Sequence, residues 1–371
     1  MIEAILEREQ KPRRHPKPVI GIFPGEGVGP EVIRAALGVL DALESNGTIR
    51  IDRIEMPAAA AVDPVEGKMP EDVELFCQEV FDRDGALLCG PGGGRFVYDM
   101  RRRFDLFCKL APIQPLQALR DATRLKPQFI RDVDLVVVRD NAGGVYQGRW
   151  SDRSDADKGR IAEHSFGYNQ QQVERIISVG LRLAKTRRGR MHVVVKEGGV
   201  PTVSALWCDV ARSLAANSGV ECTLINADHA AYRMIQHPGE FDVMVTPNLL
   251  GDLLADIGAV LLGSRGISYS ANFSGNGRAV YQTGHGGAKD LAMTDRANPL
   301  AQILSLAMLL RESFGMIEEA SLVEQAIGAV LSEGWRTEDL AEPGTRCVGT
   351  QQMGALVAES VLNLAGSPVS A

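Results

Sequence analysis

Short apolar runs alternate with amphipathic stretches along most of the chain. The apolar runs are rich in β-branched residues and predict strands at residues 18–23, 86–88, 134–138, 191–195, 221–225 and 241–245. Apolar residues at helical spacing predict helices at residues 30–43, 202–215 and 248–262. This alternation is typical of an α/β fold with a largely parallel core, in which ligands bind beyond the carboxyl ends of the strands.

The composition is that of a globular protein. A length of 371 residues suggests two domains, at about 150 residues per domain. The chain has 40 Lys and Arg against 47 Asp and Glu, so its net charge is −7. A general nucleic-acid binder needs a basic surface, and we therefore expect no nucleic-acid partner. No apolar run approaches the length of about 18 residues that a membrane span needs.

The cysteines and the N-terminal stretch bear on the compartment. None of the six cysteines forms a CxxC pair or has zinc-ligand spacing, which favours reduced thiols. Residues 1–17 lack the apolar core of a signal peptide. We expect a cytoplasmic protein.

Two carboxylates stand four residues apart in the predicted helix 248–262. This spacing places Asp252 and Asp256 on one helix face. Oxygen ligands of this kind suit Mg²⁺ or Mn²⁺. The alternative is attraction to the helix N-terminus, which explains Asp252 better than Asp256. A third acid, Asp228, follows the strand at 221–225 and would bring a ligand from another loop.

Basic side chains follow two of the predicted strands. Arg139 ends one and Lys196 ends another, where α/β folds face their ligands. A guanidinium group suits a substrate carboxylate, and a partly dehydrated lysine can act as a base. Tyr146 follows a Gly-Gly turn and is a candidate proton donor, although a structural tyrosine is the default. Residues 101–103 are all arginines, of which one or two can point inward.

Two glycine-rich loops are candidate binding segments. Residues 23–31 contain G-x-G-x-G after a strand, so free amides there could face an anion or a cofactor, and a simple tight turn is equally good. Residues 283–290 combine glycines with His285 and Asp290 and could hold a nucleotide.

Together the motifs resemble the metal-dependent β-decarboxylating dehydrogenases, which include isocitrate, isopropylmalate, homoisocitrate and tartrate/malate dehydrogenases. Residues 25–31 (GEGVGPE) are similar to the family's GDGIGPE, and residues 248–256 (NLLGDLLAD) to its NxxGDxxSD. Residues 134–148 resemble its strand and loop with Arg and Tyr, and residues 285–290 (HGGAKD) its HGSAPD. The resemblance covers about residues 18–315.

The resemblance implies two α/β domains with an active-site cleft between them. Residues 1–106 and 263–371 would form the large cofactor-binding domain. Residues 107–262 would form the small domain, which carries the interface of a homodimer with a shared active site.

The resemblance also assigns the metal and the catalytic groups. Asp252 and Asp256 would bind Mg²⁺ or Mn²⁺, and Asp228 of the other subunit would complete the site. Lys196 would act as the base, and Tyr146 would protonate the enolate.

Substrate and cofactor positions follow from the same resemblance. Arg101 and Arg139 would clamp the carboxylates of a malate-type substrate. Arg95 and Tyr98 stand where the family reads the substituent on C3, and here they suit a polar or anionic group. The implied cofactor residues are His285, Gly286, Ala288, Asp290 and Asn298. An acid at Asp290 favours NAD over NADP.

The chain departs from the family motifs in two further places. The family's N-L-R-P becomes residues 109–112 (KLAP), so Ala111 replaces a clamp arginine and Lys109 offers a charge instead. The motif after the catalytic lysine, residues 196–200 (KEGGV), has lost an asparagine.

The sequence therefore predicts NAD- and metal-dependent oxidative decarboxylation of a 3-substituted malate that differs from isopropylmalate. One alternative is a non-catalytic regulatory subunit of such an enzyme, suggested by Ala111. Another is a dehydrogenase of the same fold that acts on a phosphorylated hydroxy compound, in which histidines would bind the metal.

Overall fold

The computed structural model describes residues 1, 17–45, 47, 49–56, 68–92, 96–120 and 122–366. No helix in these ranges is both long and apolar enough to cross a membrane.

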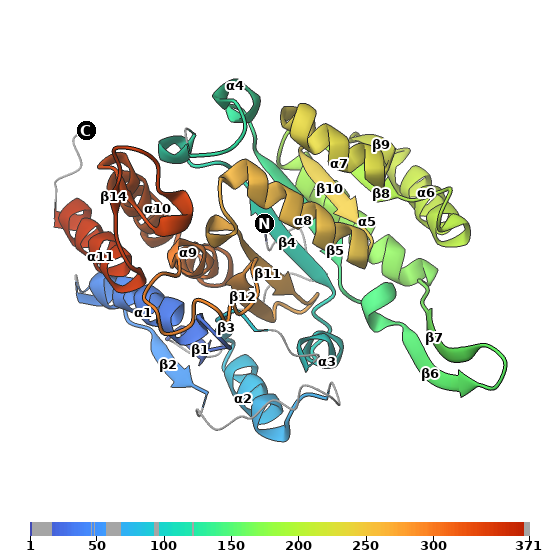
Figure 1. The fold of residues 1–371 in the computed structure, drawn as a ribbon, viewed down its shortest axis with the longest axis horizontal. Helices are drawn as coiled ribbons and strands as arrows, with labels where there is room; N and C mark the ends of the chain where they lie inside the picture. Colours follow the sequence, from blue (N-terminus) through green and yellow to red (C-terminus); the bar gives the residue numbers. More distant parts are fainter. Residues whose placement is uncertain are drawn as a thin grey trace.

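A mixed sheet of ten strands runs through the molecule (Figure 1). In spatial order its strands are β2 (Asp52–Glu55), β1 (Val19–Phe23), β3 (Ala86–Cys89), β12 (Ala279–Thr283), β11 (Tyr269–Phe273), β4 (Cys108–Ile113), β5 (Leu135–Asp140), β10 (Val243–Thr246), β8 (Arg190–Val195) and β9 (Glu221–Asn226). Pairing is parallel towards both edges, whereas β12–β11, β11–β4 and β4–β5 are antiparallel. All six predicted strands are present, and the α/β prediction is confirmed.

Helices cover both faces of this sheet. They are α1 (Gly29–Ser45), α2 (Glu71–Asp82), α3 (Phe96–Arg103), α4 (Pro127–Ile130), α5 (Gln170–Lys185), α6 (Pro201–Ala215), α7 (Ala227–Gln236), α8 (Asn248–Leu262), α9 (Leu300–Phe314), α10 (Ile317–Ser332) and α11 (Thr350–Gly366). The three predicted helices are α1, α6 and α8. Because β3, β5 and β10 are buried along their whole length, their apolar runs lack the alternation of a one-sided sheet.

Helix α9 is a central helix that packs against β11, β12, α1 and α10 (Figure 1). It is apolar on nearly all sides and buried along nearly its whole length. Its first turn follows Asn298 and Pro299, so the core fixes the end of the glycine-rich loop that starts at β12.

A hairpin of β6 (Arg149–Asp155) and β7 (Gly159–Ser165) projects from the other part of the molecule (Figure 1). The hydrophobic pattern does not predict this hairpin, because its residues are almost all exposed and carry polar groups on both faces.

One continuous sheet passes through both predicted domains. Strand β4, assigned to the small domain, pairs with β11 of the predicted large domain on one side and with β5 on the other. The division at residues 106/107 and 262/263 falls between elements, and it stays a prediction.

Candidate active site

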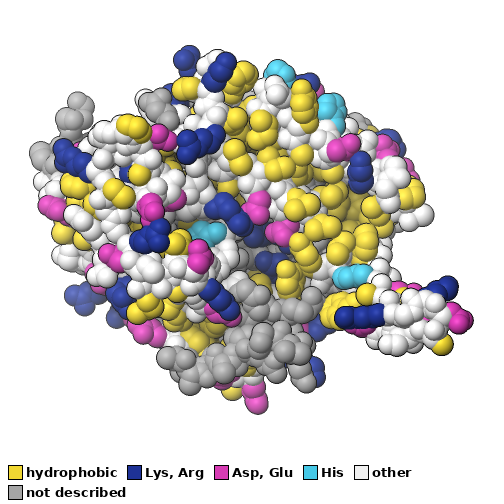
Figure 2. All heavy atoms as spheres, in the orientation of Figure 1, with side chains coloured by type: hydrophobic (Ala, Val, Ile, Leu, Met, Phe, Trp, Pro, Cys, Tyr) yellow, Lys and Arg dark blue, Asp and Glu magenta, His cyan; other side chains and the backbone are white. Residues whose placement is uncertain are grey.

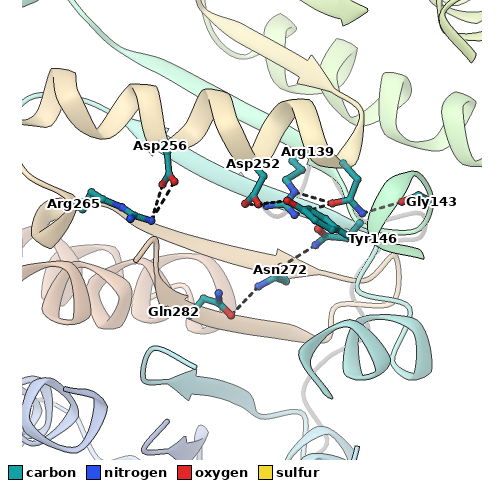
Figure 3. Close-up of polar contacts among 10 residues, drawn as sticks. Arg139, Gly143, Tyr146, Asp252, Asp256, Arg265, Asn272 and Gln282 are labelled. Carbon is teal, nitrogen blue, oxygen red and sulfur yellow. Dashed lines mark hydrogen bonds and ion pairs between the residues drawn. The ribbon is translucent and has the colours of Figure 1, made fainter. Parts of the chain in front are cut away.

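Arg139 joins the end of β5 to the start of α8. Its guanidinium is 3% exposed, and its Nε and Nη2 donate to Asn248 Oδ1 at 3.0 and 2.8 Å. Its Nη1 donates to Asp252 Oδ1. Asn248 Nδ2 in turn donates to the carbonyl of Gly143 at 2.9 Å, which fixes the loop after β5 (Figure 3). The arginine is therefore held at the carboxyl end of its strand by three hydrogen bonds to α8.

Tyr146 lies on the other side of Asp252. Its hydroxyl donates to Asp252 Oδ2 at 2.8 Å (Figure 3). Burial and this bond raise the pKa of Tyr146, so the phenol keeps its proton at neutral pH. Burial alone would raise the pKa of Asp252, but the charge of Arg139 and the bond from Tyr146 outweigh it and lower that pKa. The pair is an ionised carboxylate beside a protonated phenol.

Gly251 allows α8 to approach the sheet this closely. A Cβ atom at this position would overlap with Thr246 Oγ1 and would come within 2.9 Å of Arg139 Cβ. The glycine in the NLLGD motif is therefore needed for the contact between Asp252 and Arg139.

Asp256 lies one turn further along α8. Its carboxylate forms an ion pair with Arg265 at 3.1 Å, and both side chains are about half exposed. Asp252 and Asp256 point to the same side of α8, as their spacing predicts (Figure 3).

Lys109 and Arg101 bring further positive charge to this region. In register, Lys109 on β4 lies opposite Arg139 on β5. Burial, together with the charges of Arg139 and Arg101, lowers the pKa of Lys109 to about 7. Burial and repulsion from Arg139 likewise lower the pKa of Arg101 to about 10. Both side chains are less than one-tenth exposed.

Tyr98 on α3 connects Arg101 to Tyr146. The Arg101 guanidinium lies 5.3 Å from the centre of the Tyr98 ring, which is 5.2 Å from the Tyr146 ring. Tyr98 thus lies among the predicted substrate residues. Arg95 lies outside the described residues.

Lys196 and Asp228 form a separate group. Lys196 Nζ bonds to Asp228 Oδ1 at 2.9 Å, and this contact lowers the pKa of the carboxyl group. In the described part of the chain, neither side chain bonds to Arg139, Tyr146 or Asp252. The described residues likewise contain no group of three His, Cys, Asp or Glu that could hold a metal. The structure of one chain therefore does not bring Asp228 together with Asp252 and Asp256.

The first glycine-rich loop, residues 23–31, is hydrogen-bonded to the second, residues 283–290. The amide of Val28 donates to Gly287 O at 2.8 Å, and that of Glu26 donates to Pro91 O at 2.7 Å. A Cβ atom at Gly27, where φ is +58°, would overlap with Gly287 O. The expectation that these amides are free for an anion was wrong for Glu26 and Val28, and the loop is a tight structural turn.

The second loop carries the predicted cofactor residues from β12 to α9. His285 Nδ1 lies 2.8 Å from the carbonyl of Gly286, and burial lowers the pKa of its ring. Ala288 has a φ of +39°. Asp290 is exposed, whereas Asn298 is buried and bonds to Asp339 at 3.1 Å and to the amide of Leu300 at 3.0 Å. Asn298 therefore holds the start of α9, and the exposed Asp290 is open to a ligand.

A family model described as isocitrate/isopropylmalate dehydrogenase matches residues 19–357. The chain belongs to this family. It is 37% identical over 358 residues to the 3-isopropylmalate dehydrogenase of Carboxydothermus hydrogenoformans, with 92% of this chain and 94% of that protein covered. Identity to the 3-isopropylmalate dehydrogenase of Symbiobacterium thermophilum is 38% over 365 residues, with coverage of 92% and 98%.

Among solved structures, the isocitrate dehydrogenase from Methylococcus capsulatus superposes with a TM-score of 0.80 at 28% identity. The match covers 93% of this chain and 99% of that one. Membership of this family of decarboxylating dehydrogenases makes the chain an enzyme, an oxidoreductase of the isopropylmalate dehydrogenase type.

In this dehydrogenase a row of side-chain amide groups, which the sequence did not predict, lies beside the charged groups. Asn141 Nδ2 donates to Asn272 Oδ1 at 2.9 Å, and Asn272 Nδ2 lies 3.4 Å from Gln282 Oε1 (Figure 3). Asn272 and Gln282 interrupt the apolar runs of β11 and β12. Polar residues inside buried strands were the signal that could have found them.

Proposed function

We propose that the protein catalyses oxidative decarboxylation of a 3-substituted malate with a polar or anionic substituent, using NAD and Mg²⁺ or Mn²⁺. The contact of Tyr146 with Asp252 beside the buried Arg139 carries this proposal. It combines an anion-binding cation, a metal-ligand carboxylate and a proton donor at one strand end. The 3-isopropylmalate dehydrogenases among the relatives support the reaction class.

The buried arginines would bind the substrate. Arg101 and Arg139 are buried charges whose forked donors match carboxylates. Tyr98, which contacts both Arg101 and Tyr146, would face the substituent on C3. Arg95 keeps its proposed role there from the sequence resemblance alone.

Asp252 and Asp256 fit a hard divalent cation. Both are carboxylates on one side of α8, and the ion pair that each forms with an arginine supports the proposal that positive charge binds there. Asp228 of a second copy would supply a third oxygen ligand. When bound, the cation supplies positive charge beside the 2-hydroxyl group, where negative charge develops.

Lys196 and Tyr146 would move the protons. Lys196 of a second copy would take the proton of the 2-hydroxyl group, and NAD, when bound, would supply the acceptor for the hydride of C2. The 3-carboxylate then leaves as CO₂, and its bonding electrons remain on the enolate. Tyr146 would donate its proton to C3, and the raised pKa of the phenol ensures that this proton is present.

Residues His285, Gly286, Ala288, Asp290 and Asn298 would hold the adenosine half of NAD. The exposed carboxylate of Asp290 would accept ribose hydroxyls and repel a 2′-phosphate. Asn298 would act by fixing the loop, since its amide group already bonds to Asp339 and Leu300.

A homodimer would bring Lys196 and Asp228 to the second active site. Hydrophobic side chains gather over α7 and α8 on the face shown in Figure 2. On these two helices the side chains of Tyr232, Leu253 and Val260 are 63%, 56% and 45% exposed. An apolar surface of this kind beside Asp228 favours burial against a second copy.

A substrate panel tests the proposal. Malates with carboxymethyl, carboxyethyl, hydroxyl and isopropyl groups at C3 should be offered with NAD and Mn²⁺, and NADH followed by absorbance. We expect turnover of an acid with a polar or anionic group. No NADH from any acid with Mg²⁺ or Mn²⁺ would contradict the proposed function.

A further inference from the structure

The sheet surface beneath α8 carries a row of polar side chains. Asn272 on β11, Lys109 on β4 and Arg139 on β5 are direct partners in the register of the three strands. Side chains of directly paired residues point to the same face of a sheet. Lys109 and Arg139 are only 8% and 3% exposed. Two cations are therefore buried side by side.

These cations differ in how they are neutralised. Arg139 has Asp252 as its counter-ion. Lys109, only 8% exposed, has no hydrogen bond or ion pair with any residue that the structure describes, and the Nε atom of Arg101 is fully buried without a partner. The charges of Asp252 and Asp256 reach Lys109, but each carboxylate already has an arginine partner. A buried cation without a partner is unfavourable, and such a position suits an anionic ligand.

Position 111 on β4, where the family motif has an arginine, carries no charge in this chain. Ala111 lies two residues further along β4, so it shares the strand face of Lys109 and offers no charge. The chain therefore has its cation at position 109 instead of position 111, where the family motif has arginine.

We infer that Lys109 binds the second carboxylate of the substrate, the group that a malate has and a simple 2-hydroxy acid lacks. This inference rests on the proposed function and deepens it, since it makes Lys109 the residue that selects dianionic over monoanionic 2-hydroxy acids. An ammonium group is a point charge without the fork of an arginine. Lys109 therefore accepts a carboxylate in more orientations than an arginine would.

Binding of two isosteric probes tests the inference without turnover. Racemic malate and its 4-amide, which has the same size and one charge fewer, are titrated calorimetrically into the full-length enzyme with Mn²⁺. The variant is Lys109→Met, which keeps the length of the side chain, and the matched control is the exposed Lys126→Met. Thermal unfolding of each variant checks the fold.

For Lys109→Met we expect malate affinity to fall at least tenfold, to the level of the 4-amide, while affinity for the 4-amide changes less than twofold. Lys126→Met should bind both probes as the wild type does. Unchanged malate affinity in Lys109→Met, or an equal fall for both probes, would overturn the inference. If the wild type binds malate no better than the 4-amide, the inference also fails, whereas absence of malate binding contradicts the proposed function itself.

Discussion

The two halves of the proposed catalytic set differ in how far one chain completes them. Around the buried Arg139, three side chains from β5, the loop after it and α8 bond to one another, and Tyr146 and Asp252 in this set are half-buried. Lys196 and Asp228 lie at the surface, with side chains 41% and 70% exposed. In the proposed mechanism, substrate binding and the final protonation would therefore be prepared within one chain, whereas the base would be presented outward.

The two groups also differ in how firmly their side chains are held in place. The Arg139 half is held by a hydrogen-bond network that is closed by the Gly143 carbonyl, so its geometry exists before the substrate binds. The exposed Lys196–Asp228 pair is weakly held, because solvent screens surface ion pairs. A second copy that buries this pair would give it a fixed position.

Removal of the Tyr146 hydroxyl should have the largest effect and tests the buried half. In Tyr146→Phe we expect kcat to fall by about 10²–10⁴-fold, because a positioned proton donor is lost. KM for the substrate should change little, since Arg139 and Arg101 remain in place. Steady-state kinetics measures both, and Tyr232→Phe on the exposed face of α7 is the control. A kcat within threefold of the wild type would show that Tyr146 is not the donor.

Mixed dimers test whether the two halves come from different chains. Lys196→Met and Asp252→Asn should each be inactive alone. Co-refolded in equal amounts, they should recover about a quarter of the wild-type activity, because about half of the dimers are hybrids with one intact site. Recovery is measured as NADH formation after mixing.

The matched control for this mixture is Arg139→Met with Asp252→Asn. Both changes damage the half that one chain supplies, so no hybrid has an intact site. Equal activity in the two mixtures, or none in the first, would place Lys196 in the same active site as its own Asp252.

A charge on the apolar surface tests the proposed dimer contact. Tyr232→Glu should raise the dimer dissociation constant on the order of tenfold or more, because a carboxylate is costly to bury in an interface. Sedimentation measures this constant. Leu75→Glu, at a residue 64% exposed on α2, is the control and should leave the assembly unchanged. A Tyr232→Glu enzyme that sediments as the wild type would move the contact elsewhere.

The sequence located the elements better than it located their contacts. Apolar runs predicted β1, β5 and α8, because burial of these elements is visible in their residue types. The i, i+4 spacing likewise predicted that Asp252 and Asp256 share a helix face. The hairpin β6–β7 could not be predicted, since it has no buried face within one chain.

Long-range partners were the other part that the sequence could not supply. Nothing in residues 23–31 shows that Val28 donates to Gly287, which is far away in the chain. The same holds for the register that sets Lys109 opposite Arg139. Such pairs depend on the order of the strands in the sheet. Of the three antiparallel strand pairs at the centre of this sheet, two, β11–β4 and β4–β5, are not connected by a short turn.

The smallest effect concerns the stability of the buried half. Asp140 follows Arg139, and Gly143 N donates to its Oδ2 at 2.8 Å. Burial raises the pKa of Asp140 to about 7, above the value of about 3.9 expected in the unfolded chain. The folded protein therefore keeps a proton that the unfolded chain releases, so this group makes stability fall as pH rises from about 4 to about 7.

Asp140→Asn should remove this contribution, whose upper limit is about 1.4 kcal/mol per pH unit. Urea unfolding at pH 5 and pH 7, at one protein concentration, should show the variant gaining on the wild type at the higher pH. The exposed Asp132→Asn should run parallel to the wild type. If the unfolding free energy of Asp140→Asn changes with pH as that of the wild type does, the carboxyl group of Asp140 is ionised in the folded protein. The buried strand end would then carry a second negative charge, next to Arg139 in the chain.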